Sequence, residues 1–198
     1  MCGIVGYIGK GNAVPFLLQG LEKLEYRGYD SSGIAINSGN KIKLIKKKGR
    51  LKVVEDIVKE TPDFNSHIGI GHTRWATHGV PSDINAHPHV SSCGNFALVH
   101  NGIIENYIEI KENLIKKGYS FVSDTDSEVV VQLLSSLYNG DFLETVKETV
   151  KMLKGAFSLG IICKNDPDTL IAACKEIPLI VGVGENENYI ASGIPAML

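Results

Sequence analysis

The chain begins with Met1-Cys2-Gly3-Ile4-Val5-Gly6. Residues 2–9 predict a short strand whose glycines allow other backbone to approach closely. Because the side chain of Cys2 is small, an aminopeptidase can remove Met1. Cys2 would then carry a thiol and a free α-amine, which is the N-terminal form of a nucleophile–base pair. The alternative is a buried structural cysteine, since free cysteines are among the most buried residues.

Length and composition favour one globular domain over residues 1–198. The net charge is −2, with 20 basic and 22 acidic residues, so we expect neither nucleic acid nor an anionic membrane as a partner. The basic run Lys46-Lys47-Lys48 is interpreted as a solvated strand end. The four cysteines show no C-x-x-C spacing, and no signal peptide is recognised, which favours a reducing cytoplasm.

Helices and strands are predicted in blocks, which favours α+β layers over a parallel sheet. Asn12 can cap a helix that Gly28 ends, and residues 104–117 form another helix that ends at Gly118. A capping box at residues 125–128 starts a further helix. Two more helices are centred on residues 51–58 and 142–153, and strands are expected at 32–37, 41–47, 67–73, 95–100, 156–163, 169–174, 179–183 and 188–192.

The stretch 74–94 is predicted to be a long irregular loop, and a loop of that length inside a compact domain is usually functional. Four histidines lie in or beside it: His72, His78, His87 and His89. A zinc site is one interpretation. Their spacing matches no standard ligand pattern, so roles within the loop and as supporting groups are favoured, and no metal is expected.

Arg74, Trp75, Thr77 and His78 lie where a strand enters this loop. The planar guanidinium of Arg74 suits a carboxylate, Thr77 and His78 add donors, and Trp75 can cover a small ligand. A surface arginine beside a half-buried tryptophan is the alternative.

Asn101 and Gly102 follow another strand, and an Asn side chain with a Gly N–H can stabilise an oxyanion. The alternative is a simple Asn-Gly turn. Asp126 can compensate the dipole of the helix that begins there, or can bind an ammonium group. No Walker A motif or complete G-x-G-x-x-G is present, so no nucleotide cofactor, and no other cofactor, is expected.

Six segments match one family in the same order along the chain: residues 2–6, 24–31, 72–79, 85–89, 100–106 and 125–128. Together they resemble the glutaminase domain of glucosamine-6-phosphate synthases. This is a class II glutamine amidotransferase domain of the N-terminal nucleophile hydrolase type. The stretch Tyr26-Arg27-Gly28-Tyr29-Asp30 favours this family over other amidotransferases that share the cysteine terminus.

The resemblance implies a four-layer α+β sandwich, with two antiparallel sheets between helical layers. It implies that Cys2 is the nucleophile, and that the Asn101 side chain and the Gly102 N–H form the oxyanion hole. The remaining roles are also implied by the resemblance: Arg74, Thr77 and His78 for the glutamine carboxylate, Asp126 with the Gly102 backbone for the ammonium, Trp75 for a lid, and Arg27 and His87 as supporting groups near the nucleophile.

The resemblance also implies an activity and partners. The domain would hydrolyse L-glutamine to glutamate and ammonia. The family passes that ammonia to fructose 6-phosphate on a sugar isomerase domain of the same polypeptide, which these residues do not include. The full-length enzyme is expected to be a cytoplasmic homodimer.

Overall fold

Strand β1 (Gly3–Gly9) lies inside a six-stranded antiparallel sheet rather than at its edge. A computed structural model describes residues 2–76 and 79–198 of the chain. A Cβ atom at Gly3 would lie 2.7 Å from Oγ1 of Thr73 on the neighbouring strand, so glycine permits this close pairing. The sheet has the order β3-β2-β4-β1-β10-β9, with β2 (Ser31–Ser38), β3 (Lys41–Lys48), β4 (Ile68–Arg74), β9 (Ile180–Val183) and β10 (Glu187–Ala191).

The second sheet is antiparallel and has the order β5-β6-β7-β8. It packs face to face on the first sheet, because alternate side chains of each strand point into a shared apolar layer. That layer includes Ile4, Ala35, Ile68, Ile70, Ala97, Val99 and Ile162. The strands are β5 (His89–Val90), β6 (Phe96–Gly102), β7 (Phe157–Cys163) and β8 (Asp166–Lys175).

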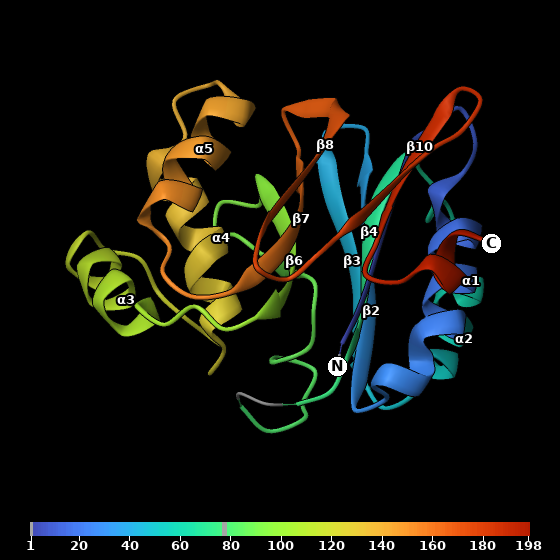
Figure 1. Cartoon of the computed structure of the whole chain (residues 1–198), viewed down its shortest axis with the longest axis horizontal. Helices are drawn as coiled ribbons and strands as arrows, with labels where there is room; N and C mark the ends of the chain where they lie inside the picture. Colours follow the sequence, from blue (N-terminus) through green and yellow to red (C-terminus); the bar gives the residue numbers. More distant parts are fainter. Residues whose placement is uncertain (1, 77–78) are drawn as a thin grey trace.

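Helices cover the outer face of each sheet, as Figure 1 shows. The first sheet is covered by α1 (Ala13–Leu24) and α2 (Leu51–Glu60), and the second by α3 (Tyr107–Lys116), α4 (Asp126–Leu137) and α5 (Phe142–Met152). The predicted four-layer sandwich is confirmed. Within residues 2–76 and 79–198, no helix has the length and apolar character needed to cross a membrane.

The helix after β1 ends earlier than the sequence predicts. Asn12 caps it as expected, but α1 stops at Leu24 and a 3-10 turn, Glu25–Arg27, follows. At Gly28 the chain passes so close to the end of β4 that a Cβ would lie 2.6 Å from the backbone nitrogen of Trp75. The tighter turn brings Arg27 to this end of the sandwich.

The long loop is mostly irregular, as predicted, but the two-residue strand β5 interrupts it. Lys46 of β3 holds the loop, because its Nζ donates to the carbonyls of Ile84 at 3.0 Å and Ala86 at 2.7 Å. Burial lowers the pKa of Lys46 to about 8. The interpretation of the whole basic run as solvated was therefore wrong for Lys46.

Only half of the predicted capping box forms at the start of α4. The Thr125 side chain accepts from the backbone N–H of Glu128, as in a capping box. The Glu128 carboxylate instead accepts from the N–H groups of Val122 at 3.0 Å and Ser123 at 2.6 Å. This buried carboxylate therefore fixes the segment that leads into α4.

Replacing Glu128 with Gln should lower the free energy of unfolding by about 2 kcal/mol, because the negative charge that strengthens the bonds to the Val122 and Ser123 N–H groups is lost and one acceptor oxygen becomes an NH₂ donor. Urea denaturation measures the change. Glu148→Gln is the matched control, since its exposed side chain forms a surface ion pair with Lys151, and it should change stability by less than about 0.5 kcal/mol. Equal effects of the two substitutions would contradict this account of Glu128.

Candidate active site

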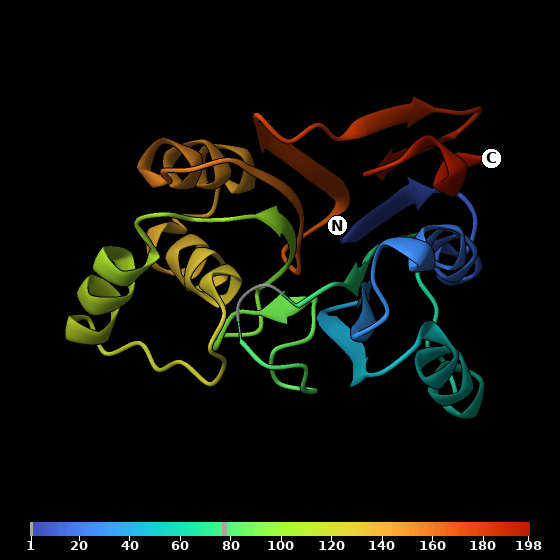
Figure 2. The same cartoon turned by 60° about the horizontal axis from the view of Figure 1, so that its bottom comes forward.

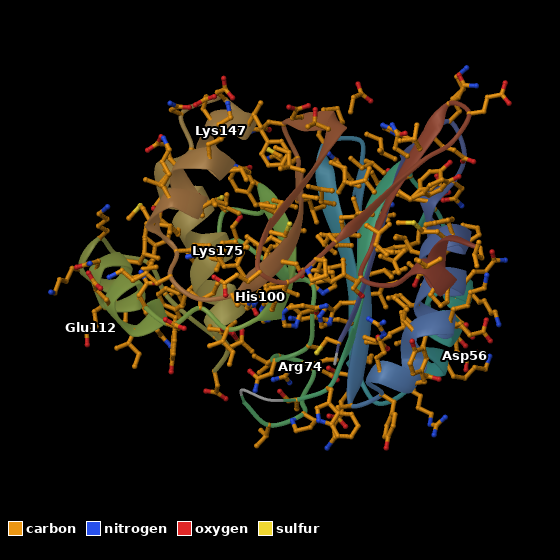
Figure 3. The ribbon with its side chains drawn as sticks, viewed as in Figure 1. Asp56, Arg74, His100, Glu112, Lys147 and Lys175 are labelled. Carbon is orange, nitrogen blue, oxygen red and sulfur yellow. The ribbon has the colours of Figure 1, made fainter. Side chains whose placement is uncertain are left out.

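A cavity of about 620 Å³ opens where β1 begins, β4 and β6 end, and α4 starts. Figure 2 looks toward this end of the sandwich, with the start of β1 near the centre. Figure 3 places Arg74 and His100 there, between the helical layers, with Asp56 and Glu112 toward opposite sides of the molecule. Eight of the predicted site residues line the cavity: Cys2, Arg27, Arg74, Trp75, His87, Asn101, Gly102 and Asp126. The other two, Thr77 and His78, lie outside the described residues.

Cys2 presents its thiol to the cavity from the chain end. The Sγ atom lies 3.2 Å from the backbone nitrogen of Trp75 and 3.4 Å from the Trp75 carbonyl oxygen. Burial raises the pKa of the Cys2 thiol above its ordinary value, and the Trp75 N–H partly offsets this. The thiol is therefore mostly protonated at neutral pH and needs a base before it can act as a nucleophile.

Asn101 and Gly102 end strand β6, where they pair with Ser158 and Phe157 of β7. The interpretation of this dipeptide as a hairpin turn was wrong. Asn101 Nδ2 donates to the carbonyl of Cys2 at 3.0 Å, which ties the second sheet to the first. Gly102 has a φ of +112°, and a Cβ there would collide with the carbonyl oxygen of Ala156, so only glycine fits.

Asp126 is the first residue of α4 and is 5% exposed. Its Oδ2 accepts from the backbone N–H of Ile104 at 2.8 Å, and its Oδ1 lies 3.9 Å from Nδ1 of His100. The carboxylate thus lines the cavity while it also lies at the positive end of the helix dipole. Both interpretations of Asp126 are compatible with this position.

Arg74 ends strand β4 and contributes a buried cation to the same cavity. Its Nη2 donates to the carbonyl of Gly79 at 3.0 Å, so it joins the strand to the loop that follows. The cavity therefore holds a guanidinium from the first sheet and a carboxylate from α4. A ligand with both an anionic and a cationic group complements this pair.

Trp75 is 46% exposed at the cavity mouth, and its ring meets the Tyr29 ring edge-on at 5.9 Å between centroids. The next residue, Ala76, donates its N–H to Asp30 Oδ2 at 2.8 Å. The start of the loop is therefore anchored to the segment that follows α1.

Arg27 and His87 lie at the cavity wall. Arg27 Nη1 donates to the carbonyl of Ser192 at 2.9 Å, so it links the 3-10 turn to the end of β10. His87 stacks on His72 at 4.3 Å between ring centroids, and its Nε2 lies 2.8 Å from Ser127 Oγ. Both residues contact groups that border the cavity.

Four buried histidines cluster at the cavity: His72, His87 and His100 line it, and His89 lies against His87. Burial lowers the pKa of His72 to about 3, and it also lowers the pKa of the other three. In each ring one nitrogen contacts a protein group, for example Ser127 for His100 and Thr125 for His89. Across the described ranges 2–76 and 79–198, no three His, Cys, Asp or Glu side chains come together as a metal-binding group.

Other cavity residues received no site role from sequence reasoning: His100, Ile103, Thr125, Ser127, Ser192 and the segment 176–178. Ser127 was interpreted only as part of the capping pattern, although its Oγ lies 2.8 Å from nitrogens of both His87 and His100. Ser192 and residues 176–178 carry no motif. Their only signal is position: Ser192 is the last residue of the predicted strand 188–192, and residues 176–178 lie between the predicted strands 169–174 and 179–183.

Stability should fall as the pH drops below 6.5, because the unfolded histidines then bind protons that the folded chain excludes until a much lower pH. Each histidine with a strongly lowered pKa should contribute a loss of about 1 kcal/mol between pH 7.5 and pH 5.5. Urea unfolding at both pH values measures this loss. In His89→Gln the loss should be smaller by that amount, and an unchanged loss would contradict the prediction. The stability of the variant is compared with that of the wild type at each pH. The part of the difference that does not change with pH is the cost of the substitution itself.

Known proteins resemble this chain over its whole length. The family described as glutamine amidotransferase domain matches residues 72–198. The glutamine–fructose-6-phosphate aminotransferase (isomerizing) of Caldanaerobacter subterraneus is 57% identical over 198 residues, and that of Clostridium perfringens is 54% identical. Both alignments cover 100% of this chain but 32% of the relative, so the chain spans about a third of the relatives' length.

Solved structures support the same grouping. The glutamine phosphoribosylpyrophosphate amidotransferase from Bacillus subtilis, complexed with ADP and GMP, superimposes with a TM-score of 0.82 at 28% identity. The match covers 96% of this chain and 42% of that one. A glutamine aminotransferase class-II domain protein from Silicibacter pomeroyi shares the fold, with a TM-score of 0.65 at 15% identity over 96% of this chain and 88% of that one. The fold, the cavity and these likenesses agree: the chain belongs to the glutamine amidotransferase domain family.

Proposed function

We propose that this chain hydrolyses L-glutamine to L-glutamate and ammonia through a γ-glutamyl thioester on Cys2. The observation that carries the proposal is that one cavity is lined by the Cys2 thiol, the Asn101 amide, the Arg74 guanidinium and the Asp126 carboxylate. Glutamine carries an amide at one end and both a carboxylate and an ammonium at the other, so it complements this set of groups.

The nucleophile in this proposal is the Cys2 thiolate. Removal of Met1 leaves an α-amine on Cys2, and such an amine has an ordinary pKa of about 8, which suits a general base near neutral pH. The amine takes the thiol proton, directly or through one water. This activation is needed because burial raises the pKa of the thiol.

The thiolate sulfur forms a bond to the δ-carbon of glutamine, and the carbonyl oxygen becomes an oxyanion. The Asn101 side chain and the Gly102 N–H donate to that oxyanion. Ammonia leaves with the proton held by the α-amine as the carbon–nitrogen bond breaks. Water then cleaves the thioester, which releases glutamate and restores the thiol.

The charged end of glutamine is held by two groups of opposite sign. Arg74 pairs with the α-carboxylate, since a guanidinium forms strong charge-assisted hydrogen bonds with a carboxylate, and Thr77 and His78 add donors. Asp126, together with the Gly102 backbone, holds the α-ammonium. Pairing both charges gives selectivity, because an analogue that lacks one leaves buried polar groups unpaired.

Three further residues support the reaction. Trp75 and its loop cover the bound glutamine as a lid. Arg27 steadies the chain near the nucleophile through its hydrogen bond to the Ser192 carbonyl. His87 supports the cavity wall through its contacts with His72 and Ser127.

The likeness to the glutamine–fructose-6-phosphate aminotransferases extends the proposal to a longer polypeptide. There the ammonia passes to fructose 6-phosphate on an isomerase domain, which yields glucosamine 6-phosphate. The longer enzyme is proposed to be a homodimer in the cytoplasm. By itself the domain described by this sequence releases ammonia.

Two other functions predict different results. A glutamine-binding domain without catalysis would retain Met1 on all molecules and bind glutamine without hydrolysing it. A metal-dependent hydrolase built on the histidines would lose activity with chelators and keep it after thiol alkylation. The contacts of Cys2 with the cavity favour the thiol-based proposal over both.

Cys2→Ala should reduce ammonia release from glutamine by at least about 10³-fold, because it removes the nucleophile. The fold should survive, because Cys2 is only partly buried and the smaller alanine side chain introduces no clash. Thermal unfolding checks this. Cys174→Ala is the matched control, because Cys174 is exposed and does not line the cavity, and it should keep full activity.

The same experiment should include the intact mass of the wild-type chain. Loss of Met1 together with glutaminase activity supports the proposal. Undiminished activity in a folded Cys2→Ala variant would refute it, and so would full activity in molecules that all retain Met1.

Asp126→Asn should lower kcat/KM for glutamine by about 10- to 100-fold, because a charged hydrogen bond to the α-ammonium is lost. The control is 4-carbamoylbutanoate, a glutamine analogue without the α-amine. If Asp126 binds the ammonium, the substitution should change kcat/KM much less with the analogue than with glutamine. Equal losses with both substrates would contradict this role.

A further inference from the structure

We propose that His72 is a positioning residue that holds the Asn101 side-chain amide in the orientation the oxyanion needs. His72 lies on β4 of the first sheet, and Asn101 lies on β6 of the second. The inference rests on the proposed glutaminase function and deepens it, since it explains how one donor of the oxyanion hole keeps its direction.

The His100 carbonyl decides which nitrogen of His72 carries the proton. Nε2 of His72 lies 3.1 Å from the backbone carbonyl oxygen of His100, and a carbonyl oxygen only accepts hydrogen bonds. Nε2 must therefore carry a hydrogen. Within the described residues, Nδ1 of His72 is buried and has no hydrogen-bond partner, which fits a neutral ring protonated at Nε2.

The protonated Nε2 then decides the orientation of Asn101. Nε2 also lies 2.9 Å from the Asn101 amide, so the amide atom facing it must be the acceptor Oδ1. The reversed amide would place two donors against each other. With Oδ1 toward His72, Nδ2 faces the Cys2 carbonyl, to which it donates at 3.0 Å.

This arrangement leaves a donor for the reaction. An amide NH₂ has two hydrogens, and the Cys2 carbonyl takes one of them. The second is the one the proposed mechanism directs to the oxyanion. A reversed amide would present an oxygen to that developing negative charge, and loss of one oxyanion donor typically costs about 10²–10³-fold in kcat.

The surroundings keep the His72 ring in place. His72 is fully buried, and the His87 ring stacks on it at 4.3 Å between centroids. The ring also stays neutral over the working pH range, because burial lowers its pKa to about 3. His72 is therefore suited to direct the amide and not to transfer protons.

Kinetics of three variants test the proposal. His72→Phe keeps a flat ring but removes the donor, and it should lower kcat by about 10²-fold with KM changed only a few-fold. His72→Gln places an amide donor near the position of Nε2 and should recover at least 10-fold of that loss. In an Asn101→Ala background, His72→Phe should have little further effect, because the group it acts through is gone.

Nitrogen-15 NMR of the wild-type imidazole gives a readout that does not depend on any variant folding. The expected result is the Nε2–H tautomer of His72, with no titration between pH 5 and pH 8. The proposal is overturned by the Nδ1–H tautomer, by full kcat in folded His72→Phe, or by losses that multiply in the double variant. An inactive wild-type chain that nevertheless shows the Nε2–H tautomer would refute the glutaminase proposal instead, and leave the orientation of Asn101 supported.

Discussion

The hydrogen bond from Asn101 Nδ2 to the Cys2 carbonyl joins the two sheets at the start of the chain. A chain end normally frays, because few contacts restrain it. Here β1 lies between β4 and β10 in the first sheet, and the second sheet holds the residue before it. The Cys2 thiol is thereby placed at a cavity whose other groups come from distant parts of the sequence.

Burial of polar groups is the second constraint at this end of the sandwich. The buried histidines at the cavity stay neutral because desolvation penalises the imidazolium form. Neutral rings can donate and accept, so they fix Ser127 and Asn101 without adding charge. Among the charged side chains that line the cavity, Arg74 at the end of β4 and Asp126 at the start of α4 are buried, whereas Arg27 and Glu176 are more exposed.

Most helices and strands were predictable because their signals are local. The Asn12 cap, the turn at residues 38–40 between β2 and β3 and the periodicity of α5 depend on neighbours within a few residues. The errors have two causes. The helix α1 ends early because Gly28 packs on the distant end of β4, and the Glu128 carboxylate bonds to Val122 and Ser123 in the irregular segment just before α4. The two-residue strand β5 is too short to leave a sequence signal.

The sequence alone determined the kinds of groups present, through the Cys2 terminus and the motifs around Arg74, Asn101 and Asp126. Only the tertiary structure decided how they meet, because the starts of β1 and α4 and the ends of β4 and β6 lie at one edge of the sandwich. It also decided that Asn101-Gly102 is strand and not turn, and that Ser127 and Ser192 border the cavity. Those outcomes depend on packing between residues far apart in the chain. Patterns over neighbouring residues do not predict such contacts.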